Sequence, residues 1–165
     1  MAVEAGKELP QCPCGSDKTY ATCCALYLES NRNPPSPEAL MRSRYTAYSL
    51  ANIDYIKKTM RGKPLNGFNE EEARHWAREA TWVGLRILKA EKASEKIGYV
   101  EFIAQFMEGD QINSIHETSE FHCNEGIWFY VDGIQKPHKR ITVARNTSCP
   151  CGSKKKFKNC HAKGK

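Results

Sequence analysis

The sequence predicts an α+β protein with a small metal-binding module at each terminus. Apolar residues recur at helical spacing between positions 37 and 80, and apolar and polar residues alternate from position 81 onward. A thirteen-residue cysteine pattern occurs near both ends of the chain. Helices followed by an antiparallel meander indicate a sheet with helices packed on one face.

Composition limits the class of protein. The chain has 165 residues, of which 40% are hydrophobic and 27% charged, as in ordinary globular proteins. Its first residues, MAVEAGKELPQ, contain no apolar run, and no stretch of ~18 apolar residues could form a membrane helix. We therefore expect a soluble cytoplasmic protein. Because the cytosol is reducing, its cysteines need an explanation other than disulfides.

The repeated cysteine pattern reads CPCGSDKTYATCC at residues 12–24 and CPCGSKKKFKNCH at residues 149–161, with seven identical positions. Only Cys123 lies outside the two repeats. In each copy, Cys-x-Cys is followed after eight residues by an adjacent pair of possible ligands, which suits tetrahedral zinc. The expected ligands are Cys12, Cys14, Cys23 and Cys24 in one module and Cys149, Cys151, Cys160 and His161 in the other.

The residues between the ligands fit a compact module. A glycine after the second cysteine, Gly15 or Gly152, allows a tight turn. We expect the next residue, Ser16 or Ser153, to be the N-cap of a short helix that leads to the closing pair. Tyr20 and Phe157 occupy equivalent positions and would supply the apolar contact of each module. So small a module cannot fold by burying apolar surface alone. A metal would therefore contribute on the order of 10 kcal/mol to its folding free energy.

Other uses of the cysteines are less consistent with the pattern. Disulfides need an oxidising compartment, and an iron–sulfur cluster suits the histidine of the second repeat less well than zinc does. Redox-active thiols more often occur as C-x-x-C, which the sequence lacks. We therefore expect two structural zinc ions, and no catalytic zinc, because protein ligands fill all four positions of each site.

Both repeats resemble the SEC-C motif, named for the C-terminal tail of the preprotein translocase ATPase SecA. The resemblance covers all eight ligand positions named above and implies that these residues bind the metal. In SecA-like tails the element docks other proteins and the ribosome, so the resemblance implies a docking role.

Basic charge is concentrated in the second repeat. The formal net charge is +6, and residues 149–165 contain six lysines and no acidic residue. Lys154, Lys155, Lys156 and Lys158 are therefore candidates for binding an acidic protein surface or RNA. A solvated lysine-rich tail that only improves solubility is the alternative.

Between the modules, helices come first. NRNPPSP at residues 31–37 is a Pro-rich linker that ends in Ser36 as N-cap and Pro37 as first helical residue. A second helix is expected over 53–60 after Asn52, then a loop at 62–69. A third helix is expected at 69–80, with Asn69 as its cap.

Strands with period-two alternation follow. In residues 81–93, Val83, Leu85 and Ile87 are expected on one face. In residues 97–107 one face is expected to carry Val100, Phe102, Ala104 and Phe106. Turns at 108–110 and 124–126 join two further strands, so one face of the sheet could enclose a pocket.

The middle of the chain resembles the YchJ family of small bacterial proteins, in LMRSRYTAYSL at 40–50 and WFYVDG at 128–133 together with the flanking SEC-C elements. This resemblance implies a cone-shaped α+β fold of the nuclear transport factor 2-like class. The expected domains are an N-terminal SEC-C module at 10–30, the nuclear transport factor 2-like domain at 36–140 and a C-terminal SEC-C module at 146–165.

No group of polar residues in the middle region predicts catalysis. His116 and Glu120 lie four residues apart on a strand, ~13 Å, too far to share a hydrogen bond. We expect these two residues to face solvent, His75 to lie at the surface or its boundary, and Cys123 to be a small buried side chain with His122 on the opposite face. A deep cavity lined by His116, Tyr130 or Asp132 would instead favour a small-molecule or hydrolytic site. The best candidates for a functional cluster are Arg42, Arg44, Tyr45 and Tyr48, although packing of a helix on the sheet explains them equally well.

Three functions remain open on the sequence. The first is a non-catalytic zinc-binding adaptor whose SEC-C modules dock a protein or the ribosome. The second is a small-molecule-binding or hydrolytic cone with the modules as targeting tags. The third is RNA binding through the lysine-rich module, which would weaken steeply with salt.

Overall fold

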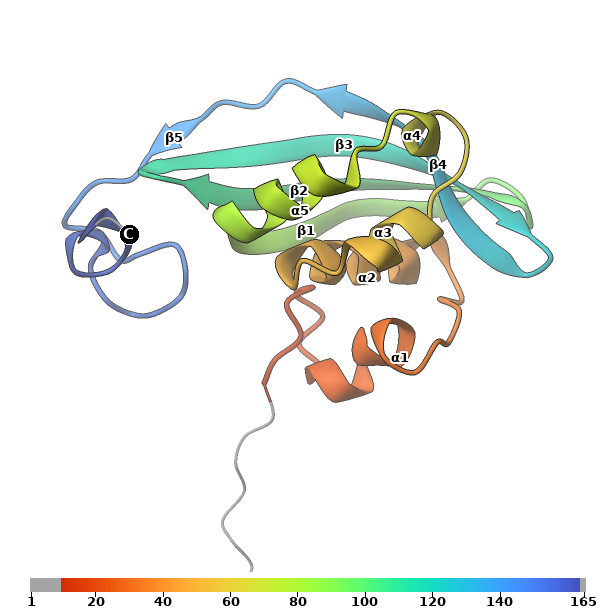
Figure 1. The fold of residues 1–165 in the computed structure, drawn as a ribbon, viewed down its shortest axis with the longest axis horizontal. Helices are drawn as coiled ribbons and strands as arrows, with labels where there is room; N and C mark the ends of the chain where they lie inside the picture. The colour runs from red at the N-terminus through yellow and green to blue at the C-terminus, as the bar shows by residue number, and fades with distance from the viewer. Residues whose placement is uncertain (1–9, 164–165) are drawn as a thin grey trace, which may run out of the picture.

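The computed structural model describes residues 10–163 (Figure 1). Its helices are η1 (Tyr20–Thr22), α1 (Ala25–Leu28), α2 (Pro37–Ser49), α3 (Ile53–Lys58), α4 (Lys63–Asn66), α5 (Glu70–Glu79), η2 (Phe157–Asn159) and η3 (His161–Lys163). Its strands are β1 (Thr81–Lys92), β2 (Ile97–Glu108), β3 (Gln111–Asn124), β4 (Ile127–Lys136) and β5 (Ile141–Thr142). The order of helices before strands confirms the predicted α+β class.

Three polar side chains fix where the main helices begin. Ser36 Oγ accepts a hydrogen bond from the Ala39 amide at 3.1 Å, at the start of α2. Asn52 and Asn69 cap α3 and α5 in the same way, with N–H to Oδ1 distances of 3.1 Å in both. The predicted caps are therefore confirmed. The predicted loop at 62–69 is wrong in part, because Lys63–Asn66 form α4, a single turn with a proline in its first positions.

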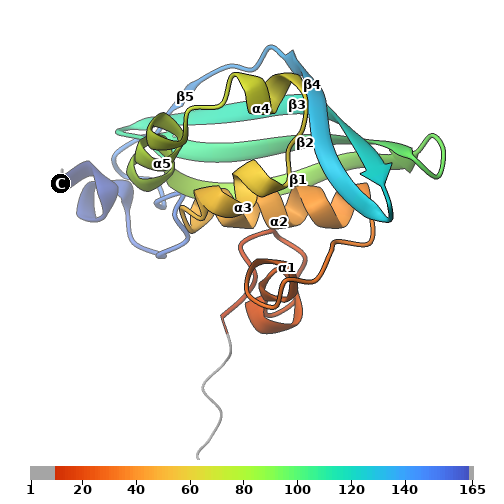
Figure 2. The ribbon, with the colours of Figure 1, turned by 45° about the vertical axis from the view of Figure 1, so that its right-hand side comes forward.

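The sheet is antiparallel, with strand order β1-β2-β3-β4 and the short β5 paired to β3. The helices α2, α3 and α5 lie together on one face of it, and β4 curls toward them (Figure 2). The face of β2 beneath the helices carries the four predicted inward residues, all buried: Val100, Phe102, Ala104 and Phe106. The predicted turns at 108–110 and 124–126 join β2 to β3 and β3 to β4.

Strand β1 departs from the predicted alternation. A register shift between Trp82 and Gly84 places Trp82 opposite Phe106, while Leu85 stands opposite Ala104. The inward face of β1 therefore carries Trp82 and not Val83, and the prediction for Val83 is wrong. A bulge inserts one residue and so reverses the facing of every side chain before it.

No helix among residues 10–163 is long and apolar enough to cross a membrane.

Candidate metal centres

The N-terminal module is a small hairpin that folds back on itself. The Cys12 amide donates to the Lys18 carbonyl at 2.8 Å, and the chain reverses at Gly15, whose φ of 73° favours glycine. A methyl group on Gly15 would lie 3.1 Å from the Leu85 carbonyl oxygen, so the turn sits directly against β1. The helical turn η1 then brings the closing pair of cysteines back over this turn.

The four cysteines of this module share one site. Their sulfurs all lie within 4.8 Å of one another, with 3.6 Å between Cys14 and Cys23 and 4.0 Å between Cys23 and Cys24. Four sulfurs placed 2.3 Å from a central zinc ion stand about 3.8 Å apart. The arrangement therefore fits a tetrahedral metal ion without movement of the backbone.

The thiols of this site shift one another's pKa values strongly. A hydrogen bond from the Cys24 thiol lowers the pKa of Cys14 to about 4, and the same contact raises the pKa of Cys24. The first thiolate forms easily, while further negative charge in the same buried space is opposed. A bound cation would remove this opposition, because metal ligation favours the deprotonated sulfur.

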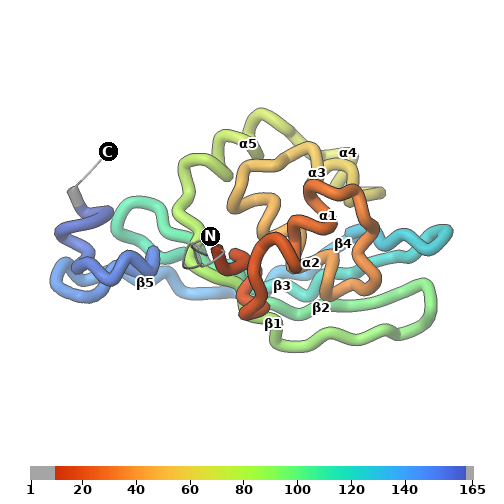
Figure 3. Tube along the Cα trace, turned by 90° about the horizontal axis from the view of Figure 1, so that it is seen from below, coloured from red at the N-terminus to blue at the C-terminus, as the bar shows by residue number. Residues whose placement is uncertain are grey.

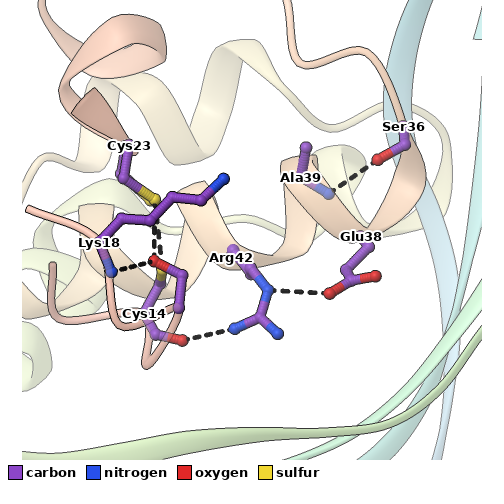
Figure 4. Close-up of polar contacts among 9 residues, drawn as sticks. Cys14, Lys18, Cys23, Ser36, Glu38, Ala39 and Arg42 are labelled. Carbon is purple, nitrogen blue, oxygen red and sulfur yellow. Dashed lines mark hydrogen bonds and ion pairs between the residues drawn. The ribbon is translucent and has the colours of Figure 1, made fainter. Parts of the chain in front are cut away.

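Helix α2 holds the N-terminal module in place. Thr46 Oγ1 donates to Cys24 Sγ at 3.3 Å and lies 3.9 Å from Cys12 Sγ. Arg42 Nη1 donates to the Cys14 carbonyl at 2.8 Å, while its Nε donates to Glu38 at 2.9 Å (Figure 4). Sequence reasoning missed Thr46, since a threonine in a helix carries no signal of contact with a distant sulfur.

The serines of the repeats have a different role from the predicted one. Ser16 Oγ lies 3.2 Å from Cys23 Sγ and accepts from the Lys18 amide at 3.4 Å. The equivalent Ser153 Oγ lies 3.4 Å from Cys160 Sγ. Both hydroxyls therefore support a ligand sulfur from just outside the site, a position that orients metal ligands.

The prediction that these serines cap a helix is wrong. The next residue, Asp17 or Lys154, has a φ of 62°, which is incompatible with the first turn of a helix. The helical turns begin only at Tyr20 and Phe157. In each module two residues of positive φ flank the serine, Gly15 and Asp17 in one and Gly152 and Lys154 in the other, so the segment forms a turn and not a helix.

The C-terminal module repeats this architecture. The Cys149 amide donates to the Lys155 carbonyl at 2.8 Å, as Cys12 does to Lys18. Its four ligand atoms lie within 4.8 Å of one another, and Cys149 Sγ is 3.2 Å from His161 Nδ1. The sequence repeat is therefore a structural repeat, in which a histidine nitrogen replaces the last sulfur.

The C-terminal module packs on the end of the sheet. Phe157 is only 2% exposed and clusters with Met107 and Val143, and Val83 and Ile112 pack against this cluster. Figures 1 and 3 show the module at one end of the sheet, well apart from the N-terminal module. The aromatic residue of the repeat therefore anchors this module on the core. Its lysines at 154–156 nevertheless remain exposed.

The other polar residues considered in the sequence lie apart. His116 Nε2 is 2.9 Å from Glu101, whereas Glu120 pairs with His122 at 2.6 Å. The side chains of His75 and Asp132 are exposed, and Cys123 packs half-buried against the main core. Arg42 lies on the N-terminal module, while Arg44, Tyr45 and Tyr48 line a cavity with Tyr130. The four residues of α2 singled out from the sequence thus divide between two places.

Comparison with known proteins agrees with this architecture. Residues 36–133 match the family described as YchJ, middle NTF2-like domain, and residues 11–26 and 145–163 match the SEC-C motif. The chain is 39% identical over 150 residues to a UPF0225 protein of Enterobacter sp. (strain 638), covering 90% of this chain and 95% of that protein.

Two solved structures have the same fold. One is the solution structure of a SEC-C motif containing protein from Rhodopseudomonas palustris, with a TM-score of 0.70, 40% identity, and coverage of 76% of this chain and 98% of that one. The other is the crystal structure of a SEC-C motif containing protein from Psychrobacter arcticus, with a TM-score of 0.65, 30% identity, and coverage of 90% and 93%. With an NTF2-like middle domain between two SEC-C motifs, this chain belongs to the YchJ family.

Proposed function

We propose that this protein is a cytoplasmic zinc-binding adaptor, in which two zinc ions fold the terminal modules and the C-terminal module docks on the acidic surface of a protein partner. The observation that carries the proposal is a pair of four-ligand clusters, of which one lies in a strongly basic segment.

The donor chemistry supports zinc at both sites. Four thiolates, or three thiolates and one imidazole, are the donor sets of structural zinc, and both sets here consist of protein side chains alone. The proposed ligands are those of the two clusters, Cys12, Cys14, Cys23 and Cys24, and Cys149, Cys151, Cys160 and His161. With no ligand position left for water or substrate, the proposed role is structural.

The charge distribution supports docking through the C-terminal module. After Asp132 the chain has ten lysine and arginine residues and no aspartate or glutamate. A zinc ion with three thiolates carries −1 and one with four carries −2, so the C-terminal site offsets less of the surrounding positive charge. Lys154, Lys155 and Lys156 are exposed, and Lys158 is half-buried. These four lysines are the proposed contacts.

A protein partner is favoured over RNA by the lack of stacking groups. Phe157 is the only Phe, Tyr or Trp residue after Tyr130, and it is 2% exposed. Recognition of single-stranded RNA uses exposed aromatic side chains on which bases stack. Contact with a phosphate backbone through lysines alone is therefore the competing outcome, and nuclease treatment distinguishes it.

The zinc proposal is tested by elemental analysis of protein purified without added metal. We expect two zinc ions per chain, falling to about one when Cys149 is replaced by serine. A content below about one zinc per unaltered chain would overturn the structural role.

The docking proposal is tested by crosslinking and co-purification from nuclease-treated cells, followed by binding measurements with the purified partner. Replacing Lys154, Lys155, Lys156 and Lys158 with glutamine should weaken binding, while the same change at four exposed lysines of the core should not. Suitable control lysines are Lys63, Lys89, Lys92 and Lys96. Equal loss in both variants would exclude a specific docking surface, and binding abolished by nuclease would assign the partner to nucleic acid.

A further inference from the structure

A cavity of about 350 Å³ lies between the sheet and the helices α2 and α5. Aromatic side chains form a large part of its wall, among them Tyr45, Tyr48, Trp76, Trp82 and Phe102. This volume is within the range of small-molecule sites, and at about 30 Å³ per molecule it has room for on the order of ten waters. Half-buried Phe68 and exposed Gln135 also line it, so the cavity reaches the surface between α4 and β4.

Arg44 brings a positive charge into this wall. Its side chain is anchored by Nη1, which donates to the Ile56 carbonyl at 2.9 Å and to Thr59 Oγ1 at 2.7 Å. Its Cζ lies 4.8 Å from the centre of the Tyr130 ring. The residue is 5% exposed, and burial lowers the pKa of its guanidinium.

Within residues 10–163, Arg44 forms no ion pair, and its Nε and Nη2 donate to no protein atom. The Glu117 carboxylate in the same wall favours the charged guanidinium but forms no ion pair with it, so two N–H groups of Arg44 are left for an anion that comes from elsewhere. The free Nε and Nη2 edge of a guanidinium presents two parallel N–H groups that match the two oxygens of a carboxylate.

Glu117 provides a second anchor in the same wall. This residue is 8% exposed, and its Oε1 accepts from Ser119 Oγ at 2.7 Å and from the Tyr130 hydroxyl at 2.9 Å. A methyl group at Gly133 would lie 2.2 Å from this oxygen, so the glycine makes room for the carboxylate. The two bonds fix one oxygen and leave the other available to a donor.

We propose that the cavity binds a small organic acid with a ring-sized apolar body and a hydrogen-bond donor. The ligand carboxylate lies on the Nε and Nη2 edge of Arg44, its donor on Glu117 and its body between the aromatic side chains. The Tyr130 ring, which contacts both charged residues, separates the two anchors. This site is independent of the metal centres and of the docking role proposed above.

The competing explanation is that Arg44 only holds the end of α3 through the Ile56 carbonyl. That role predicts no preference for acids over neutral molecules of the same shape. Comparing an acid with its ester on the unaltered protein therefore separates the two explanations without any substitution that could unfold the chain.

The test uses isotope-labelled full-length protein and three probes: 4-hydroxyphenylacetate, its methyl ester and phenylacetate. The first should shift the indole N–H signals of Trp76 and Trp82, which line the cavity, more than that of Trp128, which does not. The ester should bind at least about tenfold more weakly, because it lacks the charge that pairs with Arg44. Equal binding of acid and ester, or no shift at Trp76 and Trp82 up to about 10 mM acid, would overturn the proposal.

Variants then test the placement of the ligand. Arg44→Lys keeps the charge but loses the paired N–H groups, and should weaken binding of 4-hydroxyphenylacetate about tenfold or more. Glu117→Gln should reduce the advantage of 4-hydroxyphenylacetate over phenylacetate. Ala104→Leu fills the cavity and should abolish binding, while Ile103→Leu on the opposite face of β2 should not. Binding that survives Ala104→Leu in a folded protein would place the ligand elsewhere and refute the proposal.

Discussion

Removing the ring of Phe157 should loosen the C-terminal metal site while leaving the N-terminal one intact. Phe157 and Tyr20 occupy the same position of the repeat, but their surroundings differ. Phe157 is 2% exposed and is clustered with Met107 and Val143. Tyr20 is half-buried, and its hydroxyl donates to Glu29 at the surface, at 2.9 Å. The substitutions Phe157→Ala and Tyr20→Ala are therefore a matched pair with different expected costs.

The size of the effect follows from the burial. Truncating a fully buried phenylalanine to alanine costs about 3–5 kcal/mol. Because a module of this size folds together with its metal, the cost appears as weaker metal binding, and each 1.4 kcal/mol is about a factor of ten. Phe157→Ala should thus weaken the binding of one zinc ion by roughly 100- to 4,000-fold. Tyr20→Ala removes a ring that is half-exposed to water, so it should cost about 1–2 kcal/mol and weaken binding of the N-terminal zinc ion roughly tenfold.

The assay is competition with a chromophoric zinc chelator, which counts the ions released at each chelator concentration. Phe157→Ala should release one ion per chain at a much lower chelator concentration than the unaltered protein does, and the second ion at an unchanged concentration. Serine variants of Cys12 and Cys149 assign each step to a site. The reasoning is refuted if Phe157→Ala and Tyr20→Ala shift their steps equally, or if Phe157→Ala shifts both steps.

Three further predictions test the packing around the core. Thr46→Val removes the hydroxyl that contacts two ligand sulfurs and should weaken binding of the N-terminal ion by about 1–2 kcal/mol, measured by chelator competition. Thr118→Val, which lies outside this module, is the control. An equal effect of Thr118→Val would contradict the role of Thr46. Gly98→Ala would place a methyl group 2.4 Å from Pro37 Cγ and should cost about 1–3 kcal/mol in thermal unfolding, whereas Gly84→Ala, with no atom within 4 Å, should not show this overpacking cost. Hydrogen bonds from Lys136 and His116 hold the pKa of Glu101 below its ordinary 4.5, so this contact stabilises the fold above pH 4.5 and is lost as the pH falls through the lower folded pKa. Lys136→Met should move that pKa upward in a carboxyl NMR titration, and an unchanged midpoint would show that Lys136 contributes nothing.

Features that depend on neighbouring residues were predictable from the sequence. The caps at Ser36, Asn52 and Asn69 each involve a side chain and an amide three residues later, so the local pattern contains all the information. The same holds for the two metal clusters, because the tight turn and the short helical turn bring all four ligands together within thirteen residues. The alternation of β2 is also local and unbroken.

Features that depend on distant contacts were not predictable. The bulge at Val83 is favourable because that side chain packs with the C-terminal module, more than 60 residues later in the chain. No local pattern in either segment predicts that the two are in contact. The packing of the C-terminal module was unpredictable for the same reason: its basic residues are visible in the sequence, but the burial of Phe157 depends on Met107 and Val143.

Helix α2 shows how far a recognisable segment can be interpreted without a structure. Arg42 and Arg44 are two positions apart, about 200° around a helix, and so point in nearly opposite directions. The helix lies between the N-terminal module and the sheet, so Arg42 binds the Cys14 carbonyl while Arg44 enters the cavity. The sequence suggested one functional cluster for both arginines, but this spacing separates them, and no local pattern shows what either side chain contacts. The same helix therefore positions one metal site and one wall of the proposed ligand site, which requires particular side chains on both of its faces.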